Sequence, residues 1–328
     1  MERNYTTQMD AARRGIVTPE LETVARKEHM SVEELMPLVA AGKVAIPANR
    51  LHKCLDPEGI GSMLRTKINV NLGVSRDCKD YDVEMQKVLS AVNMGAEAIM
   101  DLSSHGNTQP FRQKLTAECP VMIGTVPVYD SVIHYQRDLA TLSAKDFIDV
   151  VRLHAQDGVD FVTLHCGITR KTIDQIRKHK RKMNIVSRGG SLVFAWMCMT
   201  GEENPFYEFY DEILDICREY DVTISLGDAC RPGCLADATD VCQIEELVRA
   251  LTDPAAKPAA PAEDEEYPES YARLVEQLEK FFSQEISIKR SKNGGGRIVI
   301  DFSDDRDIDR FIEKFEKRGA SAEIRNNK

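Results

Sequence analysis

Between residues 61 and 250 the chain repeats one pattern of apolar and polar positions: a short apolar run, a polar loop, and a longer segment whose apolar residues lie three and four positions apart. Short apolar runs rich in β-branched residues are typical of buried strands, and the wider spacing is typical of amphipathic helices. The runs predict strands at residues 67–72, 96–102, 121–128, 160–165, 184–187 and 222–226. The spacing predicts helices at residues 83–94, 144–157, 172–182 and 207–220.

Strands that alternate with helices in this way form a parallel sheet with right-handed crossovers, either a (β/α) barrel or a doubly wound sheet. An open sheet concentrates its chemistry at one switch point, whereas here every predicted strand ends in a polar or glycine-bearing motif. We therefore predict an α/β fold in which residues 61–250 form a (β/α) barrel, with about six strands marked by the pattern.

The segments on both sides of the barrel pattern differ from it in composition and in the spacing of their apolar residues. Residues 1–60 predict a helical segment, because Thr18 precedes a proline at the first helical position and Ser31 and Glu34 form a capping box. Gly42 is expected to end the second of these helices. Residues 251–270 combine proline, alanine and acidic residues, as in a solvated linker. Residues 271–328 predict a small α+β (αββα) module, with a helix at 271–282, strands at 285–292 and 297–302 joined by a turn at 293–296, and a helix from 303 or 304 to 317.

Composition and charge restrict the class of protein. The 328-residue chain has a formal net charge of −10, which argues against a general nucleic-acid binder. No apolar run approaches the roughly 20 residues of a membrane-spanning helix and the N-terminus has no secretory signal, so we expect a cytoplasmic protein with no membrane contact. The nine cysteines include no CxxC pair and suit reduced thiols better than disulfides. The closest cluster is Cys230, Cys234 and Cys242, which fits either a metal loop or, as we favour, small residues packing a strand-to-helix loop.

The candidates for chemistry lie where the predicted strands end, since a barrel collects all its carboxyl ends at one mouth. They are Asn69 and Asn71, Met100 and Asp101, Tyr129, His165, the run Ser187-Arg188-Gly189-Gly190, and Asp228 with Arg231. Taken singly, each has a structural alternative: the SRGG run can be a tight turn, His165 a core histidine, and Asn71 and Asp101 helix caps. Together they favour a polar small-molecule site, and the SRGG amides, hydroxyl and guanidinium favour an anionic substrate.

These motifs, in this order, resemble the phosphomethylpyrimidine synthase (ThiC) family of radical S-adenosylmethionine lyases. The resemblance covers residues 6–249 and is carried by TQMDAARRGIVTPE, RTKINVNLGVS, AIMDLSS, VMIGTVPVY, GVDFVTLHCGITR, NIVSRGGSLVFAWM, NPFYEFYDEILDICREYDVTISLGD and RPGCLADATD. It implies a (β/α)8 barrel that converts aminoimidazole ribotide into phosphorylated hydroxymethylpyrimidine in thiamine biosynthesis. It also implies that the ribotide contacts Asn71, Met100, Tyr129, His165, Ser187, Arg188, Gly189, Asp228, Ala229, Cys230 and Arg231.

The chain departs from the family pattern in two places. Where the family reads Asp-Gly-Leu-Arg, this chain has Ala229 and Cys230 between Asp228 and Arg231, so the related 5-hydroxybenzimidazole synthase, which uses the same ribotide, stays open as an alternative. The family also continues with two more strands, a Glu-Gly-Pro-Gly-His motif and a three-cysteine loop, none of which is found in this sequence. The resemblance therefore implies an incomplete (β/α)8 TIM-type barrel of about six strands, whose first and sixth strands are expected to be unpaired edges. The family's cofactors are S-adenosylmethionine, a [4Fe-4S] cluster and zinc. Since no residue here is assigned as a metal ligand, we expect a truncated chain that is inactive alone.

Residues 271–328 resemble another family, the C-terminal dimerisation module of chromosome-partitioning ParB proteins. The run YARLVEQLEKFFSQEISIKRSKNGGGRIVIDFSDDRDIDRFIEKF carries this resemblance, which implies a homodimer and a dimerising, weakly DNA-binding protein as an alternative function. A DNA-contacting patch could be formed by the basic residues Lys289, Arg290, Lys292 and Arg297. Solvated faces of the two strands are the alternative interpretation of these four side chains.

Overall fold

The computed structural model of the chain describes residues 3–244, 246, 286–290 and 296–300. The chain forms two compact units, Met1–Ala256 and Lys257–Lys328. The predicted linker, the two helices of the tail and the turn between its strands lie outside the described residues. The sequence also predicts a helix at residues 240–250, of which the structure describes 240–244 and 246, with 241–244 and 246 helical.

A parallel sheet of five strands is the frame of the first unit. Its strands are β3 (Asn69–Leu72), β4 (Ala98–Asp101), β5 (Met122–Thr125), β6 (Phe161–Leu164) and β7 (Thr223–Leu226). They lie in sequential order and every neighbouring pair is parallel. Five of the six predicted strands are thereby confirmed, and β3 and β7 are the two edges of the sheet. The sheet is open, and closure into a barrel is not seen in the described residues.

The strand predicted at residues 184–187 is wrong. These residues have an extended backbone without strand pairing, and β6 pairs directly with β7 through a continuous register from Phe161 opposite Thr223 to Leu164 opposite Leu226. Side chains hold the preceding backbone instead, since Asp237 accepts hydrogen bonds from the amides of Lys182 and Met183 at 2.8 and 2.7 Å. Because β6 and β7 are direct neighbours, the sheet has no place between them for the predicted strand.

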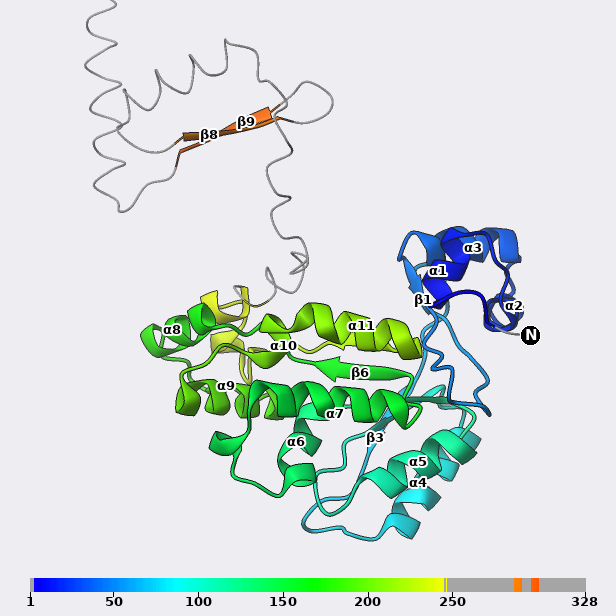
Figure 1. Ribbon diagram of the computed structural model, residues 1–328, viewed down its shortest axis with the longest axis horizontal. Helices are drawn as coiled ribbons and strands as arrows, with labels where there is room; N and C mark the ends of the chain where they lie inside the picture. Colours follow the sequence, from blue (N-terminus) through cyan, green and yellow to red (C-terminus); the bar gives the residue numbers. More distant parts are fainter. Residues whose placement is uncertain (1–2, 245, 247–285, 291–295, 301–328) are drawn as a thin grey trace, which may run out of the picture. The chain divides into compact units, whose positions relative to one another are not determined.

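Helices connect successive strands. They are α4 (Tyr81–Asn93), α5 (Gln109–Glu118), α6 (Pro127–Tyr135), α7 (Ala144–Gln156), α8 (Arg170–Lys178), α9 (Arg188–Thr200), α10 (Pro205–Glu208) and α11 (Tyr210–Tyr220), with 3-10 turns at Leu139–Thr141 and Leu235–Asp237. All four helices predicted from the apolar spacing are present, although the first turn of the last one forms the separate α10. Helices α7 and α11 pack side by side, one on each side of β6 in Figure 1.

The two faces of the sheet have different surroundings. Alternate strand residues such as Ile99, Ile123, Val162 and Leu164 are fully buried in the cores that the helices cover. The opposite face carries the exposed Asn69, Asn71 and Ser225 at its edges. Because successive side chains of a strand point to opposite faces, one face is the helix-packed core and the other is partly open.

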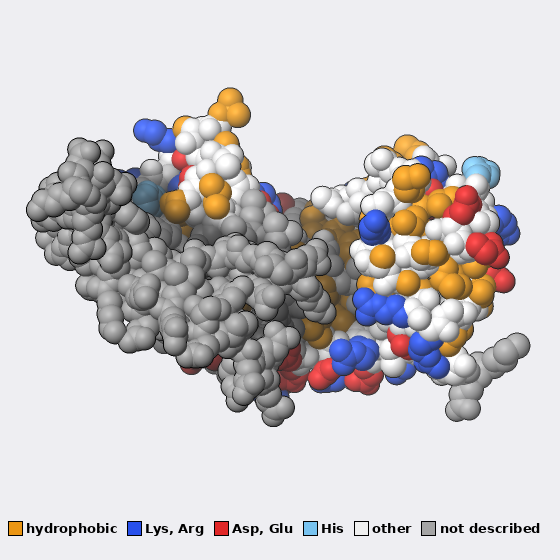
Figure 2. All heavy atoms as spheres, turned by 90° about the horizontal axis from the view of Figure 1, so that it is seen from above, with side chains coloured by type: hydrophobic (Ala, Val, Ile, Leu, Met, Phe, Trp, Pro, Cys, Tyr) orange, Lys and Arg blue, Asp and Glu red, His pale blue; other side chains and the backbone are white. Residues whose placement is uncertain are grey.

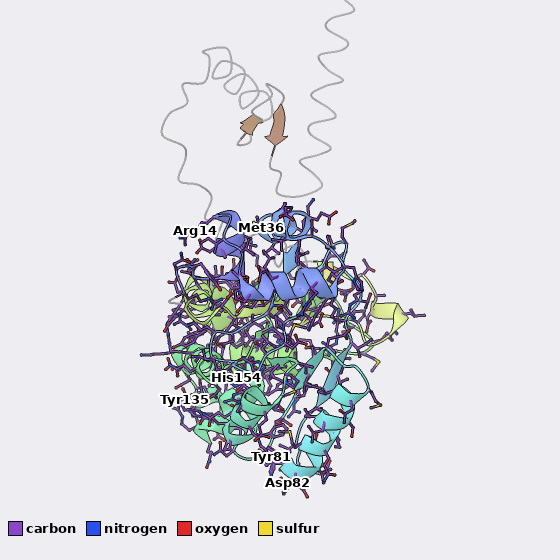
Figure 3. The ribbon with its side chains drawn as sticks, turned by 90° about the vertical axis from the view of Figure 1, so that its right-hand side faces the viewer. Arg14, Met36, Tyr81, Asp82, Tyr135 and His154 are labelled. Carbon is purple, nitrogen blue, oxygen red and sulfur yellow. The ribbon has the colours of Figure 1, made fainter. Side chains whose placement is uncertain are left out.

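A buried ionic network joins the helices behind the sheet. The guanidinium of Arg112 on α5 lies 3.1 Å from the carboxylate of Asp130 on α6 and 2.8 Å from that of Asp157 after α7. His154 on α7 lies 3.2 Å from Asp130 and 2.8 Å from the hydroxyl of Thr125. Figure 3 marks His154 within these helices. Burial, together with the positive charge of Arg112, lowers the pKa of His154 to about 4. Each buried carboxylate is paired with the guanidinium of Arg112, and the neutral imidazole lies within hydrogen-bond distance of Asp130, so the network is structural.

The N-terminal residues form a small helical layer, as predicted. It contains α1 (Gln8–Arg13), α2 (Pro19–Lys27) and α3 (Val32–Ala40), followed by the two-residue strands β1 (Val44–Ala45) and β2 (Ile60–Gly61). Thr18 caps α2, Ser31 and Glu34 form the capping box of α3, and Gly42 adopts the left-handed conformation after it. Apolar and charged side chains are interspersed on its surface (Figure 2).

A buried histidine fastens this layer to the sheet. The Nδ1 atom of His52 lies 2.7 Å from the carboxylate of Asp160, which also accepts the amides of Asn49 and Ile123 at 3.0 and 2.8 Å. Burial alone would lower the pKa of His52, but the hydrogen bond and charge of Asp160 raise it above its ordinary value. The contacts lie at the amino end of the sheet, opposite the strand ends that carry the candidate site.

In the second unit the structure describes an antiparallel hairpin of β8 (Ile286–Arg290) and β9 (Gly296–Ile300). Both strands of the predicted module are therefore confirmed. The register sets Lys289 opposite Arg297 and Arg290 opposite Gly296, while Lys292 lies outside the described residues. Dimerisation and DNA contact stay predictions.

Within the described part of the chain, no helix is both long enough and apolar enough to cross a membrane.

Candidate functional site

Three loops meet at the carboxyl ends of β6 and β7. His165 directly follows β6, Asp228 follows β7 by two residues, and Ser187 is the N-cap of α9. Parallel strands bring their carboxyl ends to one edge of the sheet, which is where α/β proteins bind ligands. The sequence prediction that these strand ends converge holds for this part of the sheet.

The imidazole of His165 lies in a slot between two glycines. A Cβ atom built on Gly189 would lie 2.2 Å from Cε1 of the ring, and one on Gly227 would lie 3.0 Å from Cδ2. The Nε2 atom lies 3.1 Å from the hydroxyl of Ser187. Burial and the nearby charge of Arg231 lower the pKa of His165 to about 4, so the ring is neutral at pH 7. A neutral imidazole held in this way can accept or donate one hydrogen bond through its other nitrogen.

Two guanidinium groups and a helix N-terminus lie beside this slot. The guanidinium carbon of Arg188 is 4.9 Å from the centroid of the Tyr129 ring, and Arg188 and Arg231 are both exposed. Burial raises the pKa of Tyr129, an effect that the charges of both arginines oppose. Since α9 begins at Arg188, its first amides and the positive end of its dipole add to the two cations. The arrangement can bind an anion such as a phosphate group.

The loop that follows β7 is fixed from behind by Glu246. Its carboxylate accepts a 2.6 Å hydrogen bond from the amide of Ala229 and a second from the amide of Cys230. The side chains of Ala229 and Cys230 are fully buried, with Cys230 inside the main core. The resemblance implies that Ala229 and Cys230 contact the ribotide, and this stays a prediction; in the structure their amides donate to Glu246 and their side chains are buried. Asp228 and Arg231 belong to the same loop, and Arg231 is exposed.

Two buried polar atoms of the cluster have no hydrogen-bond partner in the described structure. They are Nδ1 of His165 and Oδ1 of Asp228, whereas the other oxygen of Asp228 accepts a 3.0 Å bond from Gln243. Buried polar atoms nearly always have partners, so unpartnered ones next to a surface site mark positions where a ligand or water binds. Nδ1 of His165 and Oδ1 of Asp228 are thus available to form hydrogen bonds with a polar small molecule.

Asn71 and Met100 lie apart from this cluster. They occupy adjacent positions on β3 and β4, three and two strands away from β6. Met100 is buried, with its sulfur 2.8 Å from the position that a Cβ of Gly124 would take, and Asn71 is exposed on the edge strand. Within the described residues, no hydrogen bond or ion pair joins them to His165 or Asp228. The structure brings together Tyr129, His165, Ser187, Arg188, Gly189, Asp228 and Arg231, and leaves these two on the more distant strands.

Sequence reasoning missed Glu246 and Gly227. The apolar face of the helix predicted from residue 240 gives a signal for Glu246, because it lies four positions after the buried Cys242 and therefore on the same face. Gly227 directly precedes Asp228, but nothing in the sequence shows that the ring of His165 approaches it.

The described residues were tested for a place where a metal centre would fit. No group of three or more histidine, cysteine, aspartate and glutamate side chains in the described part of the chain could hold a metal ion. Cys230 and Cys242 are buried, Cys234 is half-buried, and burial raises the pKa of the first two thiols. These residues do not fit an iron–sulfur cluster or zinc, which favours the packing interpretation of the three cysteines.

Hollows elsewhere on the first unit are lined by other residues. One of about 630 Å³ lies between β3 and α4, one of about 820 Å³ lies beside α2, and one of about 280 Å³ lies beside the start of α5. None of these three is lined by a residue of the cluster. The candidate site rests on converging polar groups rather than on an enclosed cavity.

An α/β sheet with a histidine, arginines and a helix N-terminus at its carboxyl edge is an arrangement typical of α/β proteins that bind small anionic ligands. The chain belongs to the radical SAM ThiC family, which it matches over residues 7–258. It is 60% identical over 245 residues to the phosphomethylpyrimidine synthases of Clostridium botulinum (strain Loch Maree / Type A3) and Clostridium novyi (strain NT). Each alignment covers 75% of this chain and 56% of the relative, so the chain spans about half the length of the curated relatives it matches.

Proposed function

We propose that this chain binds aminoimidazole ribotide as the substrate-recognition part of a phosphomethylpyrimidine synthase, the thiamine-biosynthesis lyase that its relatives are named for. The phosphate of the ribotide would meet Arg188, Arg231 and the first amides of α9. The polar groups of its ribose and imidazole would meet His165 and Asp228. Asn71 and Met100 would contact the ribotide from β3 and β4 only if it extends along the open face of the sheet.

The convergence of His165, Arg188 and Arg231 is the observation that carries this proposal. The two arginines are exposed, and none of the ion pairs described for the chain involves either of them, whereas other arginines of the chain pair with carboxylates. An exposed cation without an acidic partner near a helix N-terminus retains its charge for an anionic ligand.

The product follows from the relatives. The relatives reported above are named for phosphomethylpyrimidine rather than hydroxybenzimidazole, which supports phosphomethylpyrimidine as the product. Membership in a radical SAM family implies S-adenosylmethionine and an iron–sulfur cluster for the reaction. The described residues fit no cluster, so the proposal for this part of the enzyme is recognition of the ribotide, with no turnover expected from the chain alone.

Calorimetric titration of the chain with aminoimidazole ribotide tests the proposal. Arg231→Ala should weaken binding about 10- to 100-fold, because a charge-assisted contact to phosphate contributes roughly 1.5–3 kcal/mol. Arg218→Ala is the matched control, since Arg218 is an exposed arginine that pairs with Asp215 on α11. Absence of binding by the unaltered chain, or equal affinities of the two variants, would contradict the proposal.

For residues 271–328 we separately propose the ParB-like dimerisation module, supported by the β8–β9 hairpin and its opposed basic residues Lys289 and Arg297.

A further inference from the structure

Glu246 contacts the loops that follow two different strands. Its carboxylate accepts hydrogen bonds from the amides of Ala229 and Cys230 in the loop after β7. Its side chain also lies against Gly167 in the loop after β6, where a Cβ atom would be 2.7 Å from Cγ of Glu246. Glu246 itself is 1% exposed. One buried carboxylate therefore joins the loop of His165 to the loop of Asp228 and Arg231.

The acceptor has to be a carboxylate with both oxygens free to accept. Each oxygen receives one amide, so a glutamine would present its NH₂ group to one of the two donors. A buried amide left without an acceptor is costly, and the loop would move to find another partner. The ionised carboxylate of Glu246 therefore has one acceptor oxygen for each of the two successive amides that directly follow Asp228.

We propose that Glu246 is a positioning residue of the candidate site, which holds Asp228 and Arg231 in register with His165 and thereby sets the affinity for the phosphorylated ribotide. The inference rests on the proposed function for its ligand, while the tie between Glu246 and the loop stands on the geometry alone. Glu246 does not touch the ligand, because it lies behind the loop and its oxygens are both occupied.

The protonation of Glu246 then controls the loop. Burial raises the pKa of Glu246 to about 7, an effect that the two amides oppose and the neighbouring Asp228 reinforces. The other titratable groups that face it are the thiols of Cys166 and Cys230, whose pKa values burial raises, so both stay protonated at neutral pH. Below pH 7 the protonated Glu246 loses one acceptor and resembles glutamine.

The test compares ribotide affinity in the unaltered chain and in Glu246→Gln at pH 8.5 and at pH 6. At pH 8.5 the variant should bind about tenfold more weakly, because one hydrogen bond to a charged group is lost. At pH 6 the two affinities should converge, since Glu246 is then protonated. The phosphate of the ribotide titrates equally in both proteins, so the ratio of affinities isolates Glu246.

Glu28→Gln is the matched control. Glu28 is also a nearly buried carboxylate that accepts a backbone amide, that of Arg65 at 2.9 Å, but it lies in the N-terminal layer and the hydrogen bonds of Lys67 and Arg65 keep its pKa low. The ratio of the ribotide affinity of Glu28→Gln to that of the unaltered chain should stay near one at pH 8.5 and at pH 6. A Glu246→Gln ratio that is near one at pH 8.5, or that is the same at both pH values, would overturn the inference.

Amide hydrogen exchange in the unaltered chain gives a readout that requires neither ligand nor variant. The amides of Ala229 and Cys230 should lose protection, relative to their intrinsic exchange rates, between pH 8.5 and pH 6. Unchanged protection of these two amides would overturn the inference that the carboxylate of Glu246 holds the loop. If the chain binds no ribotide but these amides lose protection, the proposed function fails while the tie between Glu246 and the loop stands.

Discussion

The glycines around His165 are the residues on which the shape of the candidate site depends. Gly189 and Gly227 leave room for the two sides of the imidazole, and Gly190 leaves room for Ala229, whose Cβ would be 2.7 Å from a Cβ at position 190. Gly189 and Gly190 begin a helix, a place where the backbone does not need glycine for its conformation. Their absence of side chains therefore serves close approach between loops.

Gly189→Ala should lower the free energy of unfolding by about 1–3 kcal/mol, because the new methyl group overlaps the ring of His165. Urea denaturation measures this change. The matched comparison is the same substitution in a His165→Ala background, where the ring is gone and the cost should fall below about 1 kcal/mol. An equal loss of unfolding free energy in both backgrounds would show that the ring of His165 is not the reason for glycine at position 189.

His165 and Asp228 were predictable as single residues because they follow β6 and β7, and adjacent parallel strands bring their ends together. The strand rule does not account for Ser187 and Arg188, which follow no strand, or for Tyr129, which lies within α6; for these three the family resemblance is the signal. Glu246 was missed because its partners, the amides of residues 229 and 230, lie 17 and 16 positions earlier in the sequence. Hydrogen bonds donated by backbone amides cannot be predicted from the pattern of side chains in the sequence.

Elements were predictable where the local pattern and the tertiary environment agree. The helices with spacings of three and four formed as expected, and so did the five strands with continuous partners. The run at residues 184–187 has the local character of a strand, but β6 and β7 already pair with each other along their whole length. Strand formation depends on a free neighbouring edge, which a single segment of sequence does not report.

The edge strand β3 is bordered by an apolar hollow that includes Ile68, Val70, Val83 and Met94. An edge strand with exposed apolar neighbours favours pairing with other chains. Met94 is 82% exposed, so Met94→Lys should slow aggregation, measured as the rise of light scattering at 37 °C, without lowering the melting temperature. Met63→Lys is the matched control, because Met63 is also 82% exposed but does not line this hollow. Equal aggregation rates of Met94→Lys and Met63→Lys would contradict the role of the β3 edge in aggregation.

At the scale of the whole molecule, the described residues of the first unit form an open sheet of five parallel strands with β3 and β7 at its edges. The sequence predicted an unclosed sheet and its edges, because strand count alone limits closure. It placed all the candidate residues at one mouth, whereas the structure gathers those of β6, β7 and α9 and leaves Asn71 and Met100 on the distant strands.

The central claim is that the ribotide binds at the carboxyl ends of β6 and β7, and nuclear magnetic resonance of labelled histidine rings tests it most directly. The chain has seven histidines, and His52 and His154 are buried away from the site. Addition of aminoimidazole ribotide should shift the ring signals of His165, assigned with a His165→Gln variant, and leave those of His52 and His154 in place. Binding that leaves the His165 signals unmoved would contradict the account.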